Sequence, residues 1–133
     1  MQKVLLEEFP DANLDILIVW LKMYDADSLE VVQEAARLLR DDPRVTQFYD
    51  PGKICGLEVA EGFGAKSGEV AWDVYLFYDR QAVWSEQLPQ SVDWAHQLSG
   101  SSWAETDRLF QGDQLTQKLR EIMLNLLKNG QGA

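Results

Sequence analysis

Residues 14–21, Leu-Asp-Ile-Leu-Ile-Val-Trp-Leu, form an apolar run of strand length. The run is much too short to cross a bilayer. Apolar side chains occur at both odd and even positions, whereas a strand with one wet face alternates. We therefore expect this run to be a central strand of a sheet that helices cover on both faces.

A helical pattern follows this strand over residues 28–40. Apolar residues recur there at three- and four-residue spacing, at Leu29, Val32, Ala35, Ala36 and Leu39. One face of the predicted helix is therefore apolar and is expected to pack on the preceding strand. Asp27 is the expected N-cap of this helix, with Glu30 completing a capping box.

Residues 45–49 alternate between apolar and polar side chains, which predicts a second strand. Asp50-Pro51 comes next and is a helix-start signal, because the missing N–H of proline costs nothing in the first turn. We expect a short second helix there, weakened and ended by Gly62 and Gly64.

The second half of the chain predicts two strands and a helix. Residues 68–79 are rich in aromatic and β-branched side chains and predict a third strand, and residues 92–98 alternate as a fourth. Because no helix separates them, these two strands are expected to be antiparallel neighbours. Asp113 is the expected cap of a final helix that ends at Gly130.

The predicted order of elements is β-α-β-α-β-β-α. A crossover helix returns the chain in the same direction, so the first two strands are expected to be parallel. We therefore expect a single α/β domain over residues 1–133, with a four-stranded mixed sheet flanked by helices. The apolar first strand belongs in the middle of that sheet.

The chain is acidic, with a formal net charge of −10. No Lys/Arg cluster is present, which argues against nucleic acid and against an anionic membrane surface as partners. Cys55 is the only cysteine, so an intramolecular disulfide is impossible and a reducing compartment is favoured. Residues 1–10 show no signal-peptide pattern. We expect a cytoplasmic protein without a cofactor or a metal.

The order of elements resembles the thioredoxin-like fold, and the resemblance covers residues 14–128. It lies in an apolar first strand that runs through Trp20 into an exposed loop, in an aromatic third strand, and in Gly112 shortly before the last helix. Short proteins described only as thioredoxin-like carry runs similar to Asp42-Pro43-Arg44-Val45, to residues 70–75 and to residues 96–98.

The chain departs from the thioredoxin family where that family performs its chemistry. The Cys-x-x-Cys motif would fall at residues 25–28, which are Asp-Ala-Asp-Ser. The family's cis-proline before the third strand has no counterpart at residues 70–72. Disulfide exchange needs an attacking thiol and a resolving thiol. The resemblance therefore implies a thioredoxin-like scaffold without dithiol oxidoreductase activity.

Three residues are candidates for catalysis: Cys55, Asp73 and His96. Cys55 lies near the start of the second predicted helix, where its thiol pKa can be lowered, or it is a core residue. Asp73, among apolar strand residues, is either a general base or an acceptor for a loop or tryptophan N–H. His96 either pairs with Asp73 across two strands or is a hydrogen-bonded core residue. Together the three would suit a single-thiol redox enzyme linked to peroxide or glutathione.

The loop after the first strand is the expected ligand site, with candidate contacts at Tyr24, Asp25, Asp27 and Ser28. Open α/β sheets bind ligands at the carboxyl ends of their strands. The two carboxylates can hold a cation or a basic group of a partner, or Asp27 caps the helix and Asp25 is solvated. The tryptophans are expected mostly in the core, and the alternative for Trp84 and Trp103 is an exposed apolar patch that would suit a partner or a homodimer. We therefore expect a binding or interaction module, with the thiol enzyme as the alternative.

Overall fold

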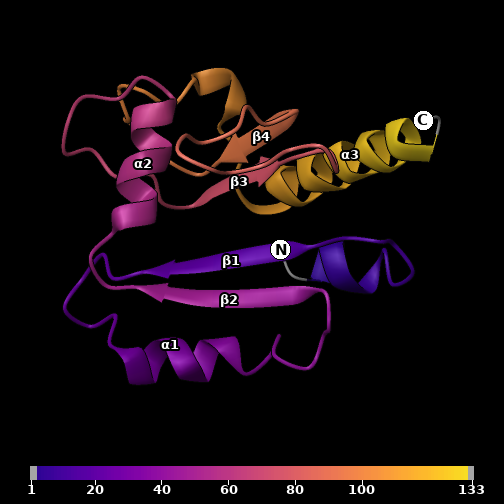
Figure 1. Ribbon diagram of the computed structural model, residues 1–133, viewed down its shortest axis with the longest axis horizontal. Coiled ribbons are helices and arrows are strands. Elements are labelled where there is room, and N and C mark those ends of the chain that lie inside the picture. The colour runs from indigo at the N-terminus through magenta and orange to yellow at the C-terminus, as the bar shows by residue number, and fades with distance from the viewer. Residues whose placement is uncertain (1–2, 132–133) are drawn as a thin grey trace.

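The computed structural model describes residues 3–131 (Figure 1). Strands and α-helices follow one another as β1 (Ile16–Leu21), α1 (Leu29–Ala36), β2 (Val45–Asp50), α2 (Ile54–Gly62), β3 (Val74–Phe77), β4 (Asp93–His96) and α3 (Gly112–Gln131). Two short turns complete the structure, the π-helical η1 (Lys3–Glu7) and the 3-10 helical η2 (Thr106–Arg108).

The strands form two separate two-stranded sheets. β1 pairs with β2 in parallel, with Ile16 opposite Val45, and β3 pairs with β4 in antiparallel, with Val74 opposite His96. Among residues 3–131, β1 forms no ladder with β3. The expected four-stranded thioredoxin-like mixed sheet, with the first strand in its middle, is therefore wrong.

Asp73 and the residues before it explain the separation of the sheets. The third strand was expected to begin at residue 68, but Asp73 has a φ of 52°, in the left-handed region, and interrupts the extended chain. Ala71 donates its backbone N–H to the carbonyl of Gly56 at 2.9 Å. The segment that would have paired with β1 is therefore bonded to α2 instead.

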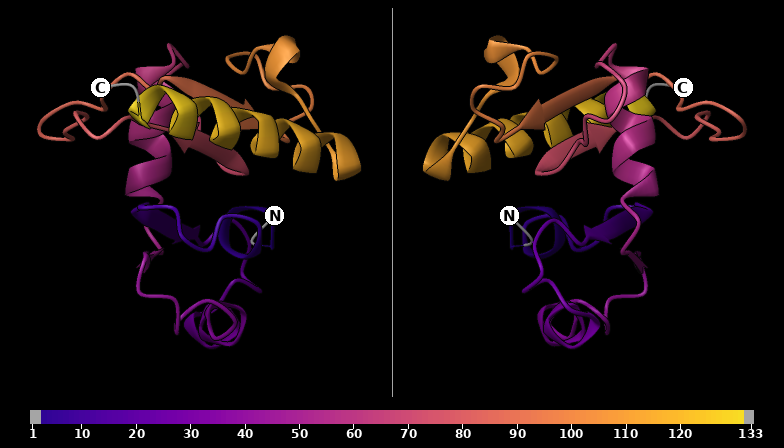
Figure 2. Two further views of the ribbon diagram at one scale, coloured as in Figure 1. Left: turned by 90° about the vertical axis from the view of Figure 1, so that its right-hand side faces the viewer. Right: turned by 90° about the vertical axis from the view of Figure 1, so that its left-hand side faces the viewer.

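The elements lie in layers (Figures 1 and 2). The β1–β2 pair lies between α1 on one side and the β3–β4 pair with α3 on the other. On the α1 side, Gln47 of β2 donates its side-chain amide to the carbonyl of Ala36 at 3.1 Å. Val32 and Leu39 are the buried side chains of this segment, whereas Leu29 and Ala35 are exposed. The apolar face that covers the strands is thus narrower than expected.

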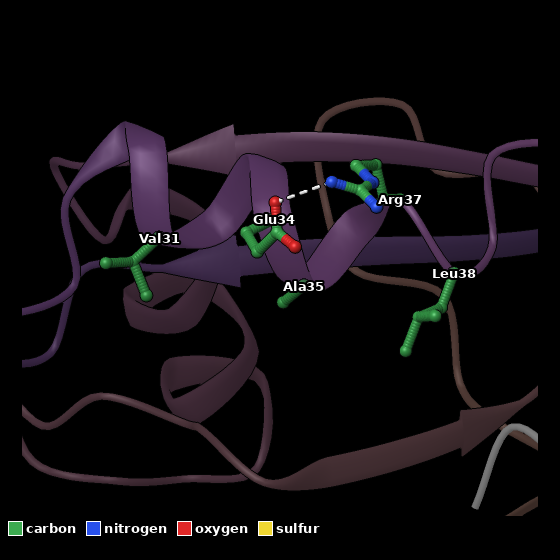
Figure 3. A pocket seen from close by; sticks show the side chains of 5 residues that line it. All are labelled: Val31, Glu34, Ala35, Arg37 and Leu38. Carbon is green, nitrogen blue, oxygen red and sulfur yellow. Dashed lines mark hydrogen bonds and ion pairs between the residues drawn. The ribbon is translucent and has the colours of Figure 1, made fainter.

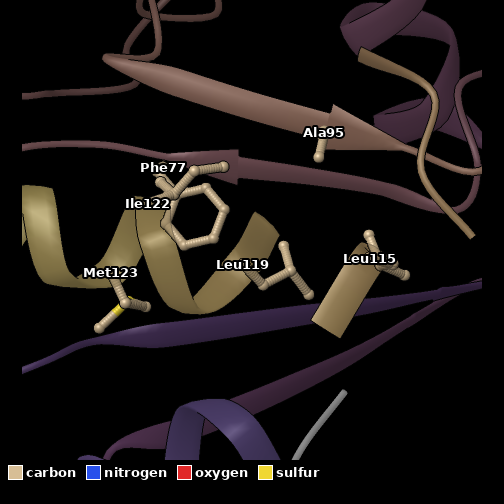
Figure 4. Close-up of a cluster of buried hydrophobic side chains, with 6 residues drawn as sticks. All are labelled: Phe77, Ala95, Leu115, Leu119, Ile122 and Met123. Carbon is tan, nitrogen blue, oxygen red and sulfur yellow. The ribbon is translucent and has the colours of Figure 1, made fainter. Parts of the chain in front are cut away.

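The larger buried cluster lies between α3 and the β3–β4 pair. Its buried members are Phe77, Ala95, Leu115, Leu119, Ile122 and Met123 (Figure 4). Leu5, Phe9 and Leu14 from the start of the chain pack against this cluster. The N-terminal segment is therefore tied to α3. Within residues 3–131, no helix combines the length and apolar character that crossing a membrane requires.

Arg44, just before β2, fastens the same N-terminal segment to the β1–β2 pair. Its guanidinium donates to the Asp42 carboxylate at 2.9 and 3.1 Å, and to the carbonyls of Phe9 at 2.6 Å and Leu6 at 3.2 Å. Hydrogen bonding to Arg44 lowers the pKa of the Asp42 carboxyl. Through the start of the chain, Arg44 thereby helps to connect the β1–β2 pair to the layer that contains α3 and the β3–β4 pair.

Candidate functional site

Two loops leave the β1–β2 pair at one edge, because the strands are parallel and end side by side. Leu21 is opposite Asp50 at this edge, and the backbone N–H of Lys22 donates to the Asp50 carbonyl at 3.4 Å. One loop leads from β1 to α1 and the other from β2 to α2 (Figure 1). We call residues 22–28 and 51–57 the strand-end surface.

Asp27 and Ser28 hold the shape of the first loop. An oxygen of the Asp27 carboxylate accepts the backbone N–H of Tyr24 at 2.9 Å, and the Tyr49 hydroxyl donates to the Asp27 carbonyl at 3.1 Å. The N-cap of α1 is Ser28, whose hydroxyl accepts the N–H of Val31 at 3.4 Å. The expectation that Asp27 caps this helix is therefore wrong, because its carboxylate is turned back into the loop.

Tyr24 and Asp25, by contrast, direct their side chains to solvent. The Tyr24 side chain is 64% exposed, and Asp25 is exposed beside it. On the second loop, Ile54 is 66% exposed at the first residue of α2, and Leu57 is partly exposed one turn later. The strand-end surface therefore presents an aromatic ring, aliphatic side chains and a carboxylate. Sequence reasoning missed Ile54 and Leu57, because their spacing also fits a buried helix face.

Cys55 is the second residue of α2 and is half-buried. Asp50-Pro51 was expected to start the second helix, but the helix begins at Ile54. The Asp50 carboxylate nevertheless serves its first turn by accepting the N–H of Cys55 at 2.8 Å. Lys53, at the N-cap position, has a left-handed φ of 58°. The turn from β2 into α2 thus places Cys55 inside the first helical turn.

The surroundings of Cys55 oppose formation of a thiolate. Burial raises the pKa of the thiol, and the carboxylates of Asp50 and Glu58 raise it further. A position in the first turn of a helix ordinarily favours the thiolate. Here burial and the two acidic neighbours outweigh it, and the thiol is predominantly protonated near neutral pH.

Tyr78, which follows β3, lies close enough to Cys55 for a thiolate there to raise the pKa of its hydroxyl, although burial is the larger cause. The hydroxyl oxygen is buried and has no hydrogen-bond partner in the described part of the chain. No sequence signal distinguished this tyrosine from the other aromatic residues of the expected third strand.

His96 is a core residue with both ring nitrogens engaged. It is fully buried, its Nδ1 accepts the backbone N–H of Leu98 at 3.0 Å, and its Nε2 lies 2.7 Å from the carbonyl oxygen of Glu105. Because Nδ1 accepts, the ring hydrogen is on Nε2 and is donated to Glu105. Both ring positions that catalysis could use are therefore occupied by backbone groups.

Asp73 is exposed and precedes β3, so it is not the buried strand residue that its apolar neighbours predicted. Partial desolvation still raises the pKa of its carboxyl. Its backbone carbonyl accepts the N–H of Gln97 at 3.0 Å. Over residues 3–131 no hydrogen bond joins the side chains of Cys55, Asp73 and His96. The structure does not bring the three together as a hydrogen-bonded set.

The expected apolar patch at two tryptophans is divided between surface and interior. Trp84 is exposed, whereas Trp103 packs against a second buried cluster, formed by Val59, Ala60 and Ala71. The Trp103 ring centroid lies 5.8 Å from that of Phe63. The two rings therefore do not form a joint exposed patch.

Two open hollows lie away from the strand-end surface. One, of about 470 Å³, is on the outer face of α1 (Figure 3), and the other, of about 510 Å³, lies between residues 6–10 and 41–44. In the region that the structure describes, no group of three His, Cys, Asp or Glu side chains could hold a metal ion.

No family model, curated protein or solved structure matches the chain. A functional interpretation therefore rests on the geometry of the strand-end surface and on the electrostatics of its thiol.

Proposed function

We propose that the chain is a binding module that contacts a protein partner through the strand-end surface. The observation that carries this proposal is the exposure of Tyr24 and Ile54, at 64% and 66%, on two loops that leave the same edge of the β1–β2 pair. Large apolar side chains that enter a partner's pockets supply most of the binding energy of many interfaces. Exposed on loops that a sheet positions, these two suit that role.

Side-chain hydrogen bonds restrain the first loop. The Asp27 carboxylate, the Ser28 hydroxyl and the Tyr49 hydroxyl each make a hydrogen bond that fixes it. Binding through a fixed loop costs less conformational entropy than binding through a mobile one. This arrangement supports a contact role for Tyr24.

The chemistry of the partner follows from charge. Asp25 is exposed beside Tyr24, and the chain carries a formal net charge of −10. A complementary partner presents a basic side chain next to an apolar pocket, because opposite charges steer the encounter and favour one orientation.

A single-thiol redox enzyme that uses Cys55 is the alternative. The first-turn position of Cys55 in α2 favours it. Burial and the neighbouring carboxylates weigh against it, since they raise the pKa of the thiol. The binding module is therefore the better supported function.

Affinity purification of variants tests the proposal. The tagged chain, a Tyr24→Ala/Ile54→Ala variant and a Cys55→Ser variant are expressed in the host cells, and co-purifying proteins are quantified. A Val83→Ala/Leu124→Ala variant is the matched control, because both side chains are also exposed. We expect a partner that remains with Cys55→Ser and with the control, but falls about tenfold or more with the first variant, since each lost anchor costs about 1 kcal/mol or more.

Two results would contradict the proposal. One is that every co-purifying protein remains at the wild-type level with Tyr24→Ala/Ile54→Ala. The other is that a partner is lost with Cys55→Ser alone, which would favour the thiol enzyme.

A further inference from the structure

The outer face of α1 and the turn after it carry an apolar stripe formed by Val31, Ala35 and Leu38. Leu38 is 85% exposed and Val31 is 54% exposed. With Glu34 and Arg37, these residues line the shallow hollow of about 470 Å³ on this face (Figure 3).

The side chains of this stripe do not pack against β1 or β2. The same segment packs toward the strands with Val32 and Leu39, and Gln47 binds the carbonyl of Ala36. The stripe lies on the side of the segment that faces away from β1 and β2 (Figure 3). Exposed apolar side chains that adjoin one another can form a contact surface.

The charges beside the stripe change sign along the segment. Glu30 and Glu34 lie in α1, and Arg37 follows at its C-cap. Residues three and four apart share one side of a helix, so these three charges border the stripe along the same flank. Glu34 and Arg37 form an ion pair at 3.0 Å, and both side chains are well exposed. Each charge can therefore also meet an opposite charge on another molecule.

An antiparallel copy of the same segment complements this pattern. A two-fold axis near Ala35 keeps the charged flank of each copy on the same side. Glu34 of each copy then lies opposite Arg37 of the other, and Val31 lies opposite Leu38. The small Ala35 side chain, at the crossing point, allows the two helices to approach closely.

We infer that a second copy of this chain docks on the stripe, with the two α1 segments antiparallel in a two-fold symmetric dimer. The contact is small, because α1 has only eight residues. It buries less than the roughly 800 Å² per partner of a standard interface. We therefore expect a weak dimer. It is separate from the partner contact at the strand-end surface.

Sedimentation equilibrium over a range of about 10 µM to about 1 mM tests this dimer. Glu34→Arg and Arg37→Glu each place like charges opposite one another, so each variant alone should self-associate about tenfold more weakly than the wild type. An equimolar mixture of the two restores opposite charges across the two-fold axis. It should form a mixed dimer with an affinity close to that of the wild type.

Leu38→Glu should abolish the dimer, and Val83→Glu, at an exposed loop position, should leave it unchanged. Circular dichroism and thermal melts verify that each variant is folded. The inference is overturned if the wild type stays monomeric over the whole range, or if Leu38→Glu leaves the dimer intact. It is also overturned if the mixture associates no better than either charge variant alone.

Discussion

Burial and two carboxylates, those of Asp50 and Glu58, raise the pKa of the Cys55 thiol above its ordinary 9.0. The folded chain therefore holds the thiol proton more tightly than the unfolded chain does. The resulting stabilisation is fully present below pH 9.0 and is lost as the pH rises through the folded-state pKa. An exposed catalytic thiol would show the opposite shift.

The rate of Cys55 alkylation as a function of pH measures this shift. We expect Cys55 to react slowly in the native protein. The pH at which the rate reaches half its maximum should lie above 9.0 in the native protein and lower after denaturation. Asp50→Asn keeps an oxygen to accept the Cys55 N–H but removes a negative charge, so it should speed the native reaction a few-fold at pH 8. A native midpoint below that of the denatured chain would contradict this account and favour the thiol enzyme.

The roles of individual residues depended on contacts that the sequence pattern does not show, whether the partner is near or far along the chain. The pattern indicated a helix start after the first strand, but which side chain caps it depended on the turn of the Asp27 carboxylate toward Tyr24. For His96, the core alternative could be stated in advance, but its partner Glu105 lies nine residues away in an irregular loop. No periodicity predicts such a contact.

At the scale of elements, the packing of α2 against the end of β1 depends on Gly56. A Cβ at this position would lie 2.6 Å from Val70 Cγ1, 2.9 Å from the Ala71 carbonyl oxygen and 2.9 Å from Leu21 Cδ1. A side chain would therefore push α2 away from the residues that hold it, including the Ala71 N–H that binds the Gly56 carbonyl.

Gly56→Ala should lower the free energy of unfolding by about 1–2 kcal/mol. Overpacking in a core costs about 1–3 kcal/mol, and the change gains up to about 1 kcal/mol of helix propensity. Gly62→Ala is a control in the same helix, because its Cβ meets the end of the flexible Leu88 side chain, which can turn away. Urea denaturation measures both. Equal stability of wild type and Gly56→Ala would show that α2 does not pack this closely.

The hydrophobic pattern predicted where most elements lie, but not how the strands pair. The helix expected at 28–40 is shorter, at Leu29–Ala36, and the strand expected at 68–79 is reduced to Val74–Phe77. Strand pairing depended on the left-handed backbone of Asp73, which L residues adopt infrequently. A pattern of apolar positions carries no information about such a turn, so the single mixed sheet was the natural but incorrect expectation.

For the whole molecule, the N-terminal segment links the β1–β2 pair to the layer that contains α3 and the β3–β4 pair. Arg44 binds the carbonyls of Leu6 and Phe9, and Phe9 packs on the cluster around α3. Side chains remain exposed both on the strand-end surface, at Tyr24 and Ile54, and on the apolar stripe, at Val31 and Leu38. The loop after the first strand could be proposed as a contact surface from the sequence, whereas the exposure of Ile54 beside it required the structure.

Site-specific photocrosslinking tests the central claim, contact through the strand-end surface, most directly. Benzoylphenylalanine replaces Tyr24 or Ile54 in the tagged chain, and Val83 or Leu124 as exposed controls. After irradiation in cells, we predict a discrete crosslinked product of one size from the two strand-end positions and not from the two controls. The absence of that product from both strand-end positions, or the same products from all four positions, would contradict the claim.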